Sequence, residues 1–214
     1  VFIRVNDAMD AIGREDIDAI SPYQDQIEAI ILPKTQSFDF LATLAPMIDF
    51  SNKLVPLIET PRAIDTVTQI AAFKDVVGLF FGAADSSASL GCKLAWEPLL
   101  YARQKVVLAA AMYNLFTIDA PFFYIDDKEG LKKEAEAVKN LGFTGKAAIH
   151  PDQIDFINES FAPTSEEIAE GKKVLEEYQK SGGGAVKIDG QMVDEPIAEA
   201  MRLKISLGEE EEED

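Results

Sequence analysis

Six short apolar segments recur along the chain, and their spacing constrains the fold more than any other feature. They begin near residues 1, 27, 54, 77, 116 and 147, so the intervals between them are 26, 27, 23, 39 and 31 residues. Each interval has room for one crossover helix, as a strand–helix–strand unit requires. The segments are apolar throughout rather than alternating, which favours strands buried on both faces of a parallel sheet.

This pattern predicts an α/β protein with six strand–helix units. It leaves two architectures open, an open doubly wound sheet and an incomplete (β/α)8 barrel. No strand is followed by G-x-G-x-x-G, which disfavours a dinucleotide-binding sheet. Ser37 is a candidate helix cap, and Pro61 suits the first position of a helix. Strands are expected at 1–5, 27–32, 54–58, 76–81, 115–118 and 145–149, and helices at 13–20, 37–48, 97–113 and 127–141.

The pattern changes after residue 150. A helix rich in Glu and Lys is expected at 165–180, followed by a Gly-rich hinge at 181–184. Asp189-Gly190 is typical of a hairpin turn, and a final helix is expected at 196–207. We therefore expect barrel units over 1–162, a C-terminal lid or oligomer contact over 163–207, and a disordered acidic tail over 208–214.

Composition excludes several classes of function. The formal net charge of −18 argues against nucleic-acid binding, which draws on clustered Lys and Arg. The single cysteine, Cys92, excludes an internal disulfide framework and favours the reducing cytoplasm. No apolar run reaches the roughly 18 residues that span a bilayer, so no membrane partner is expected. The chain begins inside an expected strand without an initiator Met, so we expect a missing N-terminal segment.

Polar side chains stand where the expected strands end. In parallel α/β folds the carboxyl ends of the strands carry the reactive groups, and a barrel would gather them around one mouth. These residues are Arg4, Asn6, Lys34, Glu59, Asp85, Asp119 and His150.

Glu59 and Asp85 come from adjacent units and form a donor set that suits Mg²⁺, which takes one or two carboxylates and leaves its other positions to water and substrate. Arg4 offers a planar fork for a substrate carboxylate. The three side chains indicate a site for an anionic keto or hydroxy acid. The same carboxylates would serve equally as helix caps.

The ordered motifs of the chain resemble a known family. The chain is similar to the citrate lyase β-subunit-like proteins of the HpcH/HpaI aldolase superfamily, which includes malyl-CoA and citramalyl-CoA lyases. The similarity runs over roughly residues 1–200. The motifs that carry it are R-V-N at 4–6, I-L-P-K at 31–34, L-I-E-T-P-R at 57–62, F-G-A-A-D at 81–85, Y-A-R at 101–103 and A-I-H-P-D-Q-I at 148–154.

The resemblance implies a Mg²⁺-dependent TIM barrel that cleaves or forms a C–C bond in a 3-hydroxyacyl thioester of CoA or an acyl carrier protein. It implies that Glu59 and Asp85 bind the metal and that Arg4 grips the substrate carboxylate. Lys34 is a candidate contact for the thioester or its phosphates. Gly190 to Pro196 resembles a lid motif whose acid–base residue, here Asp194, enters a neighbouring subunit's site, so a homo-oligomer, a trimer or hexamer, is expected.

Two departures from the family pattern matter. Relatives often have an acidic residue where this chain has Ala84, so the metal shell would be less negative. The family strands that end in L-F-V-P-G and D-L-E-D-A-V have no counterpart, so the first two barrel units are expected to be absent. Two alternatives therefore stay open, a class II aldolase acting on free pyruvate-derived hydroxy acids and a non-catalytic barrel fragment.

The remaining chemically suggestive residues have structural interpretations. His150 is expected to close a strand and cap the next helix, and Arg103 to form an internal ion pair. Cys92 has no neighbouring His and is not expected to be a nucleophile. Residues 122–124 would line the carrier channel or pack in the core. The identity of the released 2-oxo acid, whether oxaloacetate, pyruvate or glyoxylate, depends on pocket shape.

Overall fold

A computed structural model describes residues 1–48, 50, 53–182 and 184–210. The chain divides into two compact units, Val1–Ile157 and Asn158–Asp214. The first unit holds a six-stranded sheet and the second a two-stranded sheet. None of the helices in the described part of the chain is long and apolar enough to cross a membrane.

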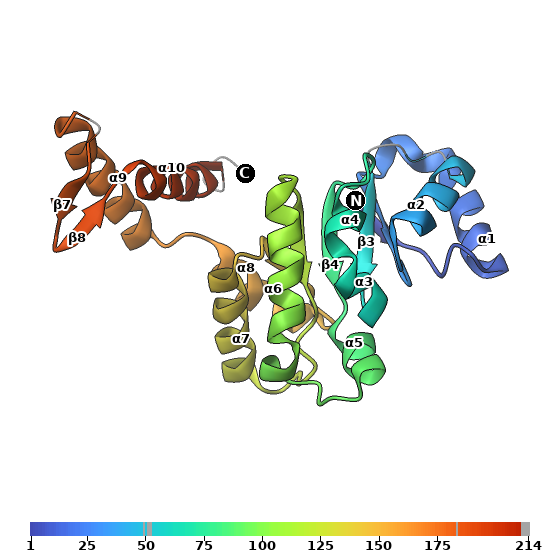
Figure 1. Cartoon of the computed structure of the whole chain (residues 1–214). Coiled ribbons are helices and arrows are strands. Elements are labelled where there is room, and N and C mark those ends of the chain that lie inside the picture. Colours follow the sequence, from blue (N-terminus) through green and yellow to red (C-terminus); the bar gives the residue numbers. More distant parts are fainter. Residues whose placement is uncertain (49, 51–52, 183, 211–214) are drawn as a thin grey trace. The chain divides into compact units, whose positions relative to one another are not determined.

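The large sheet is parallel throughout, and its strands lie in chain order. A doubly wound sheet reverses direction at a switch point, whereas this order advances one strand per crossover, as in a barrel. The sequential order therefore disfavours the doubly wound sheet, and the described strands form a parallel sheet of six. The strands are β1 (Phe2–Arg4), β2 (Ala29–Leu32), β3 (Leu54–Ile58), β4 (Gly78–Phe81), β5 (Phe116–Asp119) and β6 (Gly145–Lys146) (Figure 1).

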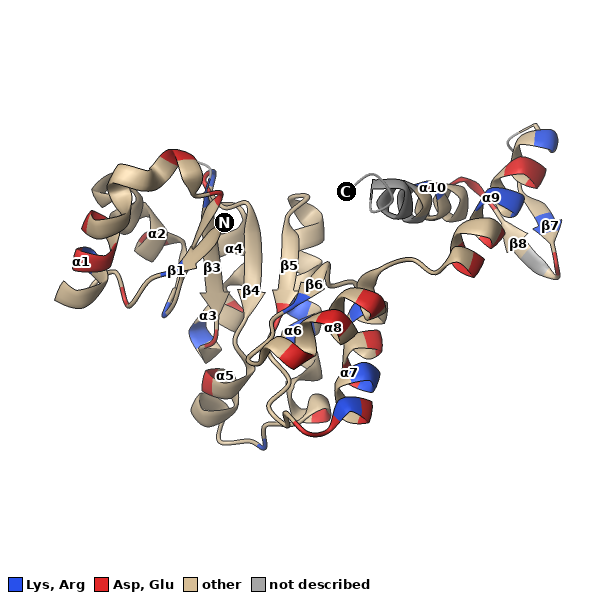
Figure 2. Ribbon diagram, turned by 180° about the vertical axis from the view of Figure 1, so that it is seen from behind, with Lys and Arg blue, Asp and Glu red and all other residues tan. Residues whose placement is uncertain are grey.

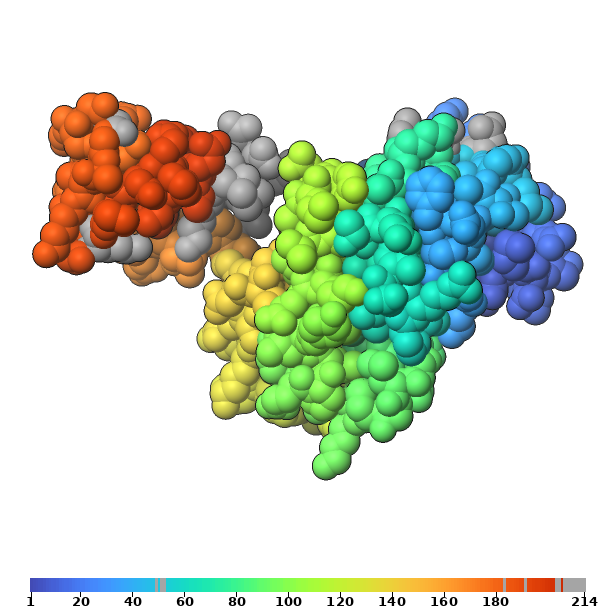
Figure 3. Space-filling view, viewed as in Figure 1, coloured from blue at the N-terminus to red at the C-terminus, as the bar shows by residue number. Residues whose placement is uncertain are grey.

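Helices accompany each crossover. Figure 1 shows α6 in front of the sheet, and Figure 2 shows the strands from behind. The neighbouring α4 and α6 pack against each other on the outer surface (Figure 3). The helices are α1 (Ala11–Ile20), α2 (Phe38–Leu44), α3 (Pro61–Asp65), α4 (Val67–Ala71), α5 (Ala83–Leu90), α6 (Trp96–Met112), α7 (Lys128–Leu141) and α8 (Ile154–Phe161), with 3₁₀ turns at Ser21–Gln26, Ala45–Met47 and Pro151–Gln153.

Local signals place the helix ends as expected. The Ser37 side chain accepts a hydrogen bond from the N–H of Phe40, and Pro61 opens α3. Gly142 ends α7 in the left-handed conformation at φ 105°, which glycine adopts without steric cost. The sequence reading did not include α5, whose Ser-rich stretch has weak helix propensity. It also made the sixth strand too long, because only Gly145–Lys146 pairs with β5.

The centre of the sheet is buried on both faces, as the continuous apolar runs predict. Every residue of β2 and β3 is buried. One face carries a cluster of Ala29, Ile31, Val55 and Leu57. Burial of this kind contributes roughly 25 cal/mol per Å² of apolar surface, and it makes these strands a rigid support for the residues at their ends.

The second unit is a helix–hairpin–helix arrangement that the sequence predicted closely. Helix α9 (Ser165–Lys180) begins with a capping box between Thr164 and Glu167. Strands β7 (Val186–Ile188) and β8 (Gln191–Val193) pair antiparallel around Asp189-Gly190, whose φ values of 47° and 91° fit a tight hairpin turn.

The last helix reaches into the segment 208–214, for which a disordered acidic tail was expected. Helix α10 (Glu195–Glu210) continues through residues 208–210, of which Glu209 and Glu210 are good helix formers. Residues 211–214 lie outside the described residues. The core of this unit consists of Val174, Tyr178, Ile188, Val193 and Ala198.

Candidate functional site

A cavity of about 330 Å³ opens where β1, β2 and β3 end and α5 begins. It brings together five of the strand-end residues that the sequence singled out, Arg4, Asn6, Lys34, Glu59 and Asp85. Four acidic and two basic residues from separate segments thus share one cavity with four aliphatic or proline residues. The cavity is lined by Arg4, Val5, Asn6, Asp7, Asp10, Ile12, Pro33, Lys34, Leu57, Glu59 and Asp85.

Glu59 is a buried residue that lines this cavity. It follows the last residue of β3 and is only 2% exposed. Its Oε1 atom accepts a hydrogen bond of 2.8 Å from the backbone N–H of Lys34. Gly82 packs against it, because a Cβ atom at Gly82 would lie 2.6 Å from the Cβ atom of Glu59. Backbone contacts therefore hold this carboxylate in a single place.

Asp85 lies opposite Glu59 in the first turn of α5. Its side chain is 55% exposed. The amino end of a helix carries a partial positive charge, which favours a carboxylate at this position. Asp85 therefore presents a charged oxygen to the cavity from a fixed helical position.

The two carboxyl groups influence each other's ionisation. Burial raises the pKa of Glu59, and the hydrogen bond from the Lys34 backbone opposes this effect. The pKa of Asp85 is lowered, first by its hydrogen bond with the Glu59 side chain and then by Lys34. Of the two carboxyl groups, Glu59 therefore holds a proton more tightly than Asp85 does. A cation between them would favour ionisation of both groups.

Lys34 supplies the cation that the carboxylates contact in the structure. Its Nζ atom lies 3.7 Å from Oε1 of Glu59 and 3.3 Å from Oδ2 of Asp85. One positive charge therefore bridges both groups. The pKa of Lys34 is raised: partial burial lowers it, but the charges of Glu59 and Asp85 outweigh that effect.

Arg4 lies at the end of β1 and lines the same cavity. Its positive charge contributes to the lowered pKa of Asp85. Within the described part of the chain, its guanidinium has no hydrogen-bond or ion-pair partner, so its donors are available to a ligand. A free guanidinium fork beside two carboxylates suits a ligand that carries both a carboxylate and a cation-binding oxygen.

The donor set fits a magnesium ion. Glu59 and Asp85 already converge on one cation, and the cavity has room for water or substrate oxygens. No group of three or more His, Cys, Asp or Glu that could hold a metal occurs among the described residues. Mg²⁺ binds to one or two carboxylates and leaves its remaining positions to water and substrate, as these residues would allow. A structural Zn²⁺ site instead needs four protein ligands, usually Cys and His.

Asp119 and His150 do not line this cavity, contrary to the expectation that all strand-end residues meet at one mouth. Asp119 is fully buried, and its carboxylate accepts hydrogen bonds from Arg103 at 2.8 Å and from Lys146 at 3.0 Å. His150 caps a 3₁₀ turn through Nδ1, which accepts from the N–H of Asp152. The Asp119 carboxylate is therefore paired with two buried cations and is absent from the cavity lining.

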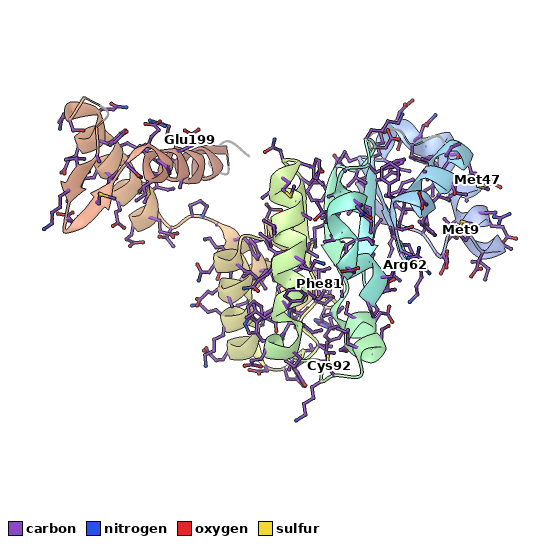
Figure 4. The ribbon with its side chains drawn as sticks, viewed as in Figure 1. Met9, Met47, Arg62, Phe81, Cys92 and Glu199 are labelled. Carbon is purple, nitrogen blue, oxygen red and sulfur yellow. The ribbon has the colours of Figure 1, made fainter. Side chains whose placement is uncertain are left out.

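Arg103 forms the internal ion pair that the sequence predicted. Its guanidinium also lies 5.1 Å from the centre of the Phe81 ring and 4.7 Å from that of Trp96. Figure 4 shows Phe81 beneath α6, the helix that carries Arg103. This polar cluster stabilises the sheet next to β4 and has no part in the cavity.

Two acidic lining residues escaped the sequence analysis. Asp7 and Asp10 lie between β1 and α1 and line the cavity. The available signal was their position directly after the first strand, next to Arg4 and Asn6. Asp194 belongs to the second unit, where it directly precedes α10, and its predicted acid–base role stays a prediction.

Comparison with known proteins identifies the family. The family model described as HpcH/HpaI aldolase/citrate lyase matches residues 1–151. The chain belongs to the HpcH/HpaI aldolase/citrate lyase family. The similarity in motifs over the first unit is therefore confirmed, and the family members found by comparison are carbon–carbon lyases.

Curated relatives of this family align over almost the whole chain. The chain is 30% identical to citrate lyase subunit beta of Haemophilus influenzae over 217 residues, which covers 94% of this chain and 74% of the relative. It is also 30% identical to the mitochondrial citramalyl-CoA lyase of Homo sapiens over 230 residues, covering 96% of this chain and 67% of that enzyme.

Solved structures of family members share the fold. CitE from Mycobacterium tuberculosis, in complex with magnesium, acetoacetate and coenzyme A, matches with a TM-score of 0.84 at 29% identity, covering 97% of this chain and 78% of that chain. RipC from Yersinia pestis matches with a TM-score of 0.72 at 41% identity, covering 78% and 79%. The α/β fold with a curled parallel sheet is thus that of citrate lyase β structures.

Proposed function

We propose that this chain is a Mg²⁺-dependent carbon–carbon lyase that cleaves or forms a 3-hydroxyacyl-CoA thioester. Candidate substrates are citramalyl-CoA, malyl-CoA and citryl-CoA, which yield acetyl-CoA and a 2-oxo acid. The observation that carries the proposal is the convergence of Glu59 and Asp85 on one cation in the cavity that Arg4 lines. Support comes from the lyase names of the relatives and from the magnesium and coenzyme A in the CitE complex.

Glu59 and Asp85 would hold the ion, which supplies Lewis-acid polarisation of a substrate oxygen when it is bound. Arg4 would hold the substrate carboxylate through charge-assisted hydrogen bonds and so orient the bond that breaks. Lys34 would contact the thioester end or its phosphates. Each of these roles uses a side chain that already lines the cavity.

In the cleavage direction, the substrate hydroxyl would lose its proton to solvent water, and its C–O bond would become the carbonyl of the 2-oxo acid. The electron pair of the broken C–C bond passes to the thioester, which becomes an enolate. Asp194 would give this enolate a proton at carbon to form acetyl-CoA, and in reverse it would remove the same proton. General acid–base help of this kind is worth roughly 10²–10⁴-fold.

We further propose that the six parallel strands are part of a (β/α)8 barrel and that residues 163–207 form a lid. The sequential strand order supports the first point. The hairpin followed by Asp194 and α10 supports the second, because it presents the carboxylate from a compact unit. In this arrangement the lid of one subunit serves its neighbour in a homo-oligomer, a trimer or hexamer.

The test is acetyl-CoA release from citramalyl-CoA, malyl-CoA and citryl-CoA, with and without Mg²⁺. We expect Mg²⁺-dependent release from at least one thioester and none from a free 4-hydroxy-2-oxo acid. Cleavage of the free acid alone would indicate a class II aldolase instead, and the absence of all turnover would indicate a non-catalytic fragment.

A matched pair of variants tests the acid–base role. Asp194→Ala should lower turnover by roughly 10²–10⁴-fold while Mg²⁺ still binds. Glu199→Gln removes a charge from an exposed position of the same unit and should leave turnover unchanged. Full turnover in Asp194→Ala would show that another group moves the proton.

A further inference from the structure

The backbone of Lys34 has a conformation that is unusual for lysine. Its φ is 56°, and the other described non-glycine residues with positive φ are Asn114 and Asp189. Asn and Asp tolerate this region through their short polar side chains, whereas in lysine the Cβ atom crowds the carbonyl oxygen. Residues held in such conformations often serve a site.

Specific hydrogen bonds hold this turn. The N–H of Lys34 donates to Oε1 of Glu59 at 2.8 Å. The hydroxyl of the next residue, Thr35, donates to the carbonyl of Leu32 at 3.0 Å and is fully buried. The strained backbone is therefore set by contacts at both ends, and one of them is a carboxylate of the candidate site.

The same turn places the Lys34 ammonium between two carboxylates. In the part of the chain that the structure describes, it is the one cation within 4.0 Å of either Glu59 or Asp85. The Glu59 side chain is only 3% exposed, so water screens its charge poorly. A buried carboxylate without a cation is costly, and Lys34 offsets that cost.

We propose that the Lys34 ammonium is a built-in counter-ion that occupies the cation position in the metal-free protein and leaves it when Mg²⁺ binds. This inference rests on the proposed function. Two cations cannot share the space between the carboxylates, because their repulsion at such distances is strong. The flexible side chain of lysine can withdraw toward the cavity while its backbone N–H continues to hold Glu59. Lys34 is thus a positioning residue in both states.

This role predicts a specific pattern in Mg²⁺ binding. Lys34→Met removes the competing cation, so Mg²⁺ should bind about 2- to 10-fold more tightly, as measured by titration calorimetry with Mg²⁺ alone. The metal-free variant should melt at a lower temperature than the wild type, because Glu59 and Asp85 lose their counter-ion. Lys34→Gln serves as a second variant if Lys34→Met does not fold.

Arg4→Met is the matched control, because it removes an equal charge from the same cavity without touching an ion pair. It should change both the Mg²⁺ affinity and the metal-free melting temperature less than Lys34→Met does, because Arg4 acts on Asp85 through its charge without an ion pair. Equal effects of the two variants would show that only the general charge of the cavity matters, and would overturn the inference. An unchanged affinity in Lys34→Met would overturn it as well.

The outcomes separate this inference from the proposed function. If the wild-type protein binds no Mg²⁺, both the magnesium chemistry and the displacement of Lys34 are wrong. If the wild type binds Mg²⁺ and Lys34→Met binds it equally well, the magnesium site stands and only the counter-ion role fails.

Discussion

Gly82 and Glu59 lie so close together that a Cβ atom at position 82 would come within 2.6 Å of the Cβ atom of Glu59. Gly82 directly precedes α5, and its N–H donates to the carbonyl of Ile58. The glycine therefore allows the end of β3 and the start of α5 to approach each other. This approach is what brings the carboxylates of two consecutive units to one cation.

Replacing this glycine should damage the site more than the fold. Gly82→Ala pushes Glu59 out of place, and a displacement of about 1 Å can cost roughly 10²-fold in turnover. We expect Mg²⁺ affinity and lyase turnover to fall together in calorimetry and acetyl-CoA assays. Gly145→Ala is the control, because a Cβ atom there has nothing within 4 Å. Wild-type affinity in Gly82→Ala would contradict this account of the site.

Glu59→Gln should stabilise the metal-free protein at neutral pH. Burial raises the pKa of Glu59 above its ordinary value of 4.5, so the folded protein binds a proton more tightly than the unfolded chain. Wild-type stability therefore falls as pH rises from about 4.5 through the folded pKa. Glutamine carries no charge and does not lose stability in this way. The stability difference between Glu59→Gln and the wild type should therefore disappear below pH 4.5.

With Mg²⁺ present, the sign of this effect should reverse. The wild type then gains stability from the bound ion, whereas Glu59→Gln has lost a ligand. Denaturant titrations with EDTA and with Mg²⁺, at neutral and acidic pH, measure both effects. If Glu59→Gln were less stable than the wild type in EDTA at neutral pH, burial would not be the main influence on the pKa of Glu59.

Asp119→Asn should destabilise the first unit strongly. The Asp119 carboxylate pairs with Arg103 and with the fully buried ammonium of Lys146, and the substitution leaves excess positive charge in the interior. Breaking a buried pair in this way costs about 3–5 kcal/mol, measured as the change in the free energy of unfolding.

The control for this prediction is an exposed ion pair. Asp65 lies 3.6 Å from Lys105, and its side chain is 86% exposed. Asp65→Asn should therefore change stability by no more than about 1 kcal/mol. Equal losses in Asp65→Asn and Asp119→Asn would show that burial of the Asp119 cluster is not what makes it stabilising.

The second unit should lose stability in acid through Glu195. Arg202 and Tyr178 donate hydrogen bonds to this carboxylate and lower its pKa below 4.5, with Arg202 as the larger cause. A lowered folded pKa adds stability above pH 4.5 that is lost as pH falls through it. In hydrogen exchange, Glu195→Gln should reduce amide protection of α9 and α10 at neutral pH, with the difference vanishing in acid.

Glu199→Gln provides the comparison, since Glu199 contacts Arg202 at a longer distance of 3.4 Å. Its protection should stay close to that of the wild type at both pH values. If Glu199→Gln lost amide protection at neutral pH and Glu195→Gln did not, the stabilising contact would belong to Glu199 and the prediction would be wrong.

The sequence predicted most local elements because short-range physics decides them. The apolar runs mark β2 and β3, and hydrogen-bonding caps such as Ser37 set helix starts. The hairpin at Asp189-Gly190 follows from the two residues that accept positive φ. The exceptions are α5, whose sequence is a weak helix former, and the length of β6, which depends on pairing with β5.

The sequence identified the residues of the site by their position at strand ends, but it did not predict which side chains contact one another. Glu59, Asp85 and Arg4 are recognisable as strand-end polar residues and by their family resemblance. That Asp119 turns to Arg103 and Lys146 instead depends on side chains 16 and 27 residues away in sequence. Such pairings arise only after the crossover helices have packed.

By itself, the sequence determined the α/β repeat, the family motifs and the donor chemistry of Glu59 and Asp85, because these depend on residue type and local periodicity. The tertiary structure alone decided the sequential strand order, the close approach of Gly82 to Glu59 and the position of the Lys34 ammonium. The physical reason is that these features depend on backbone segments far apart in the chain, whose separation is set by packing.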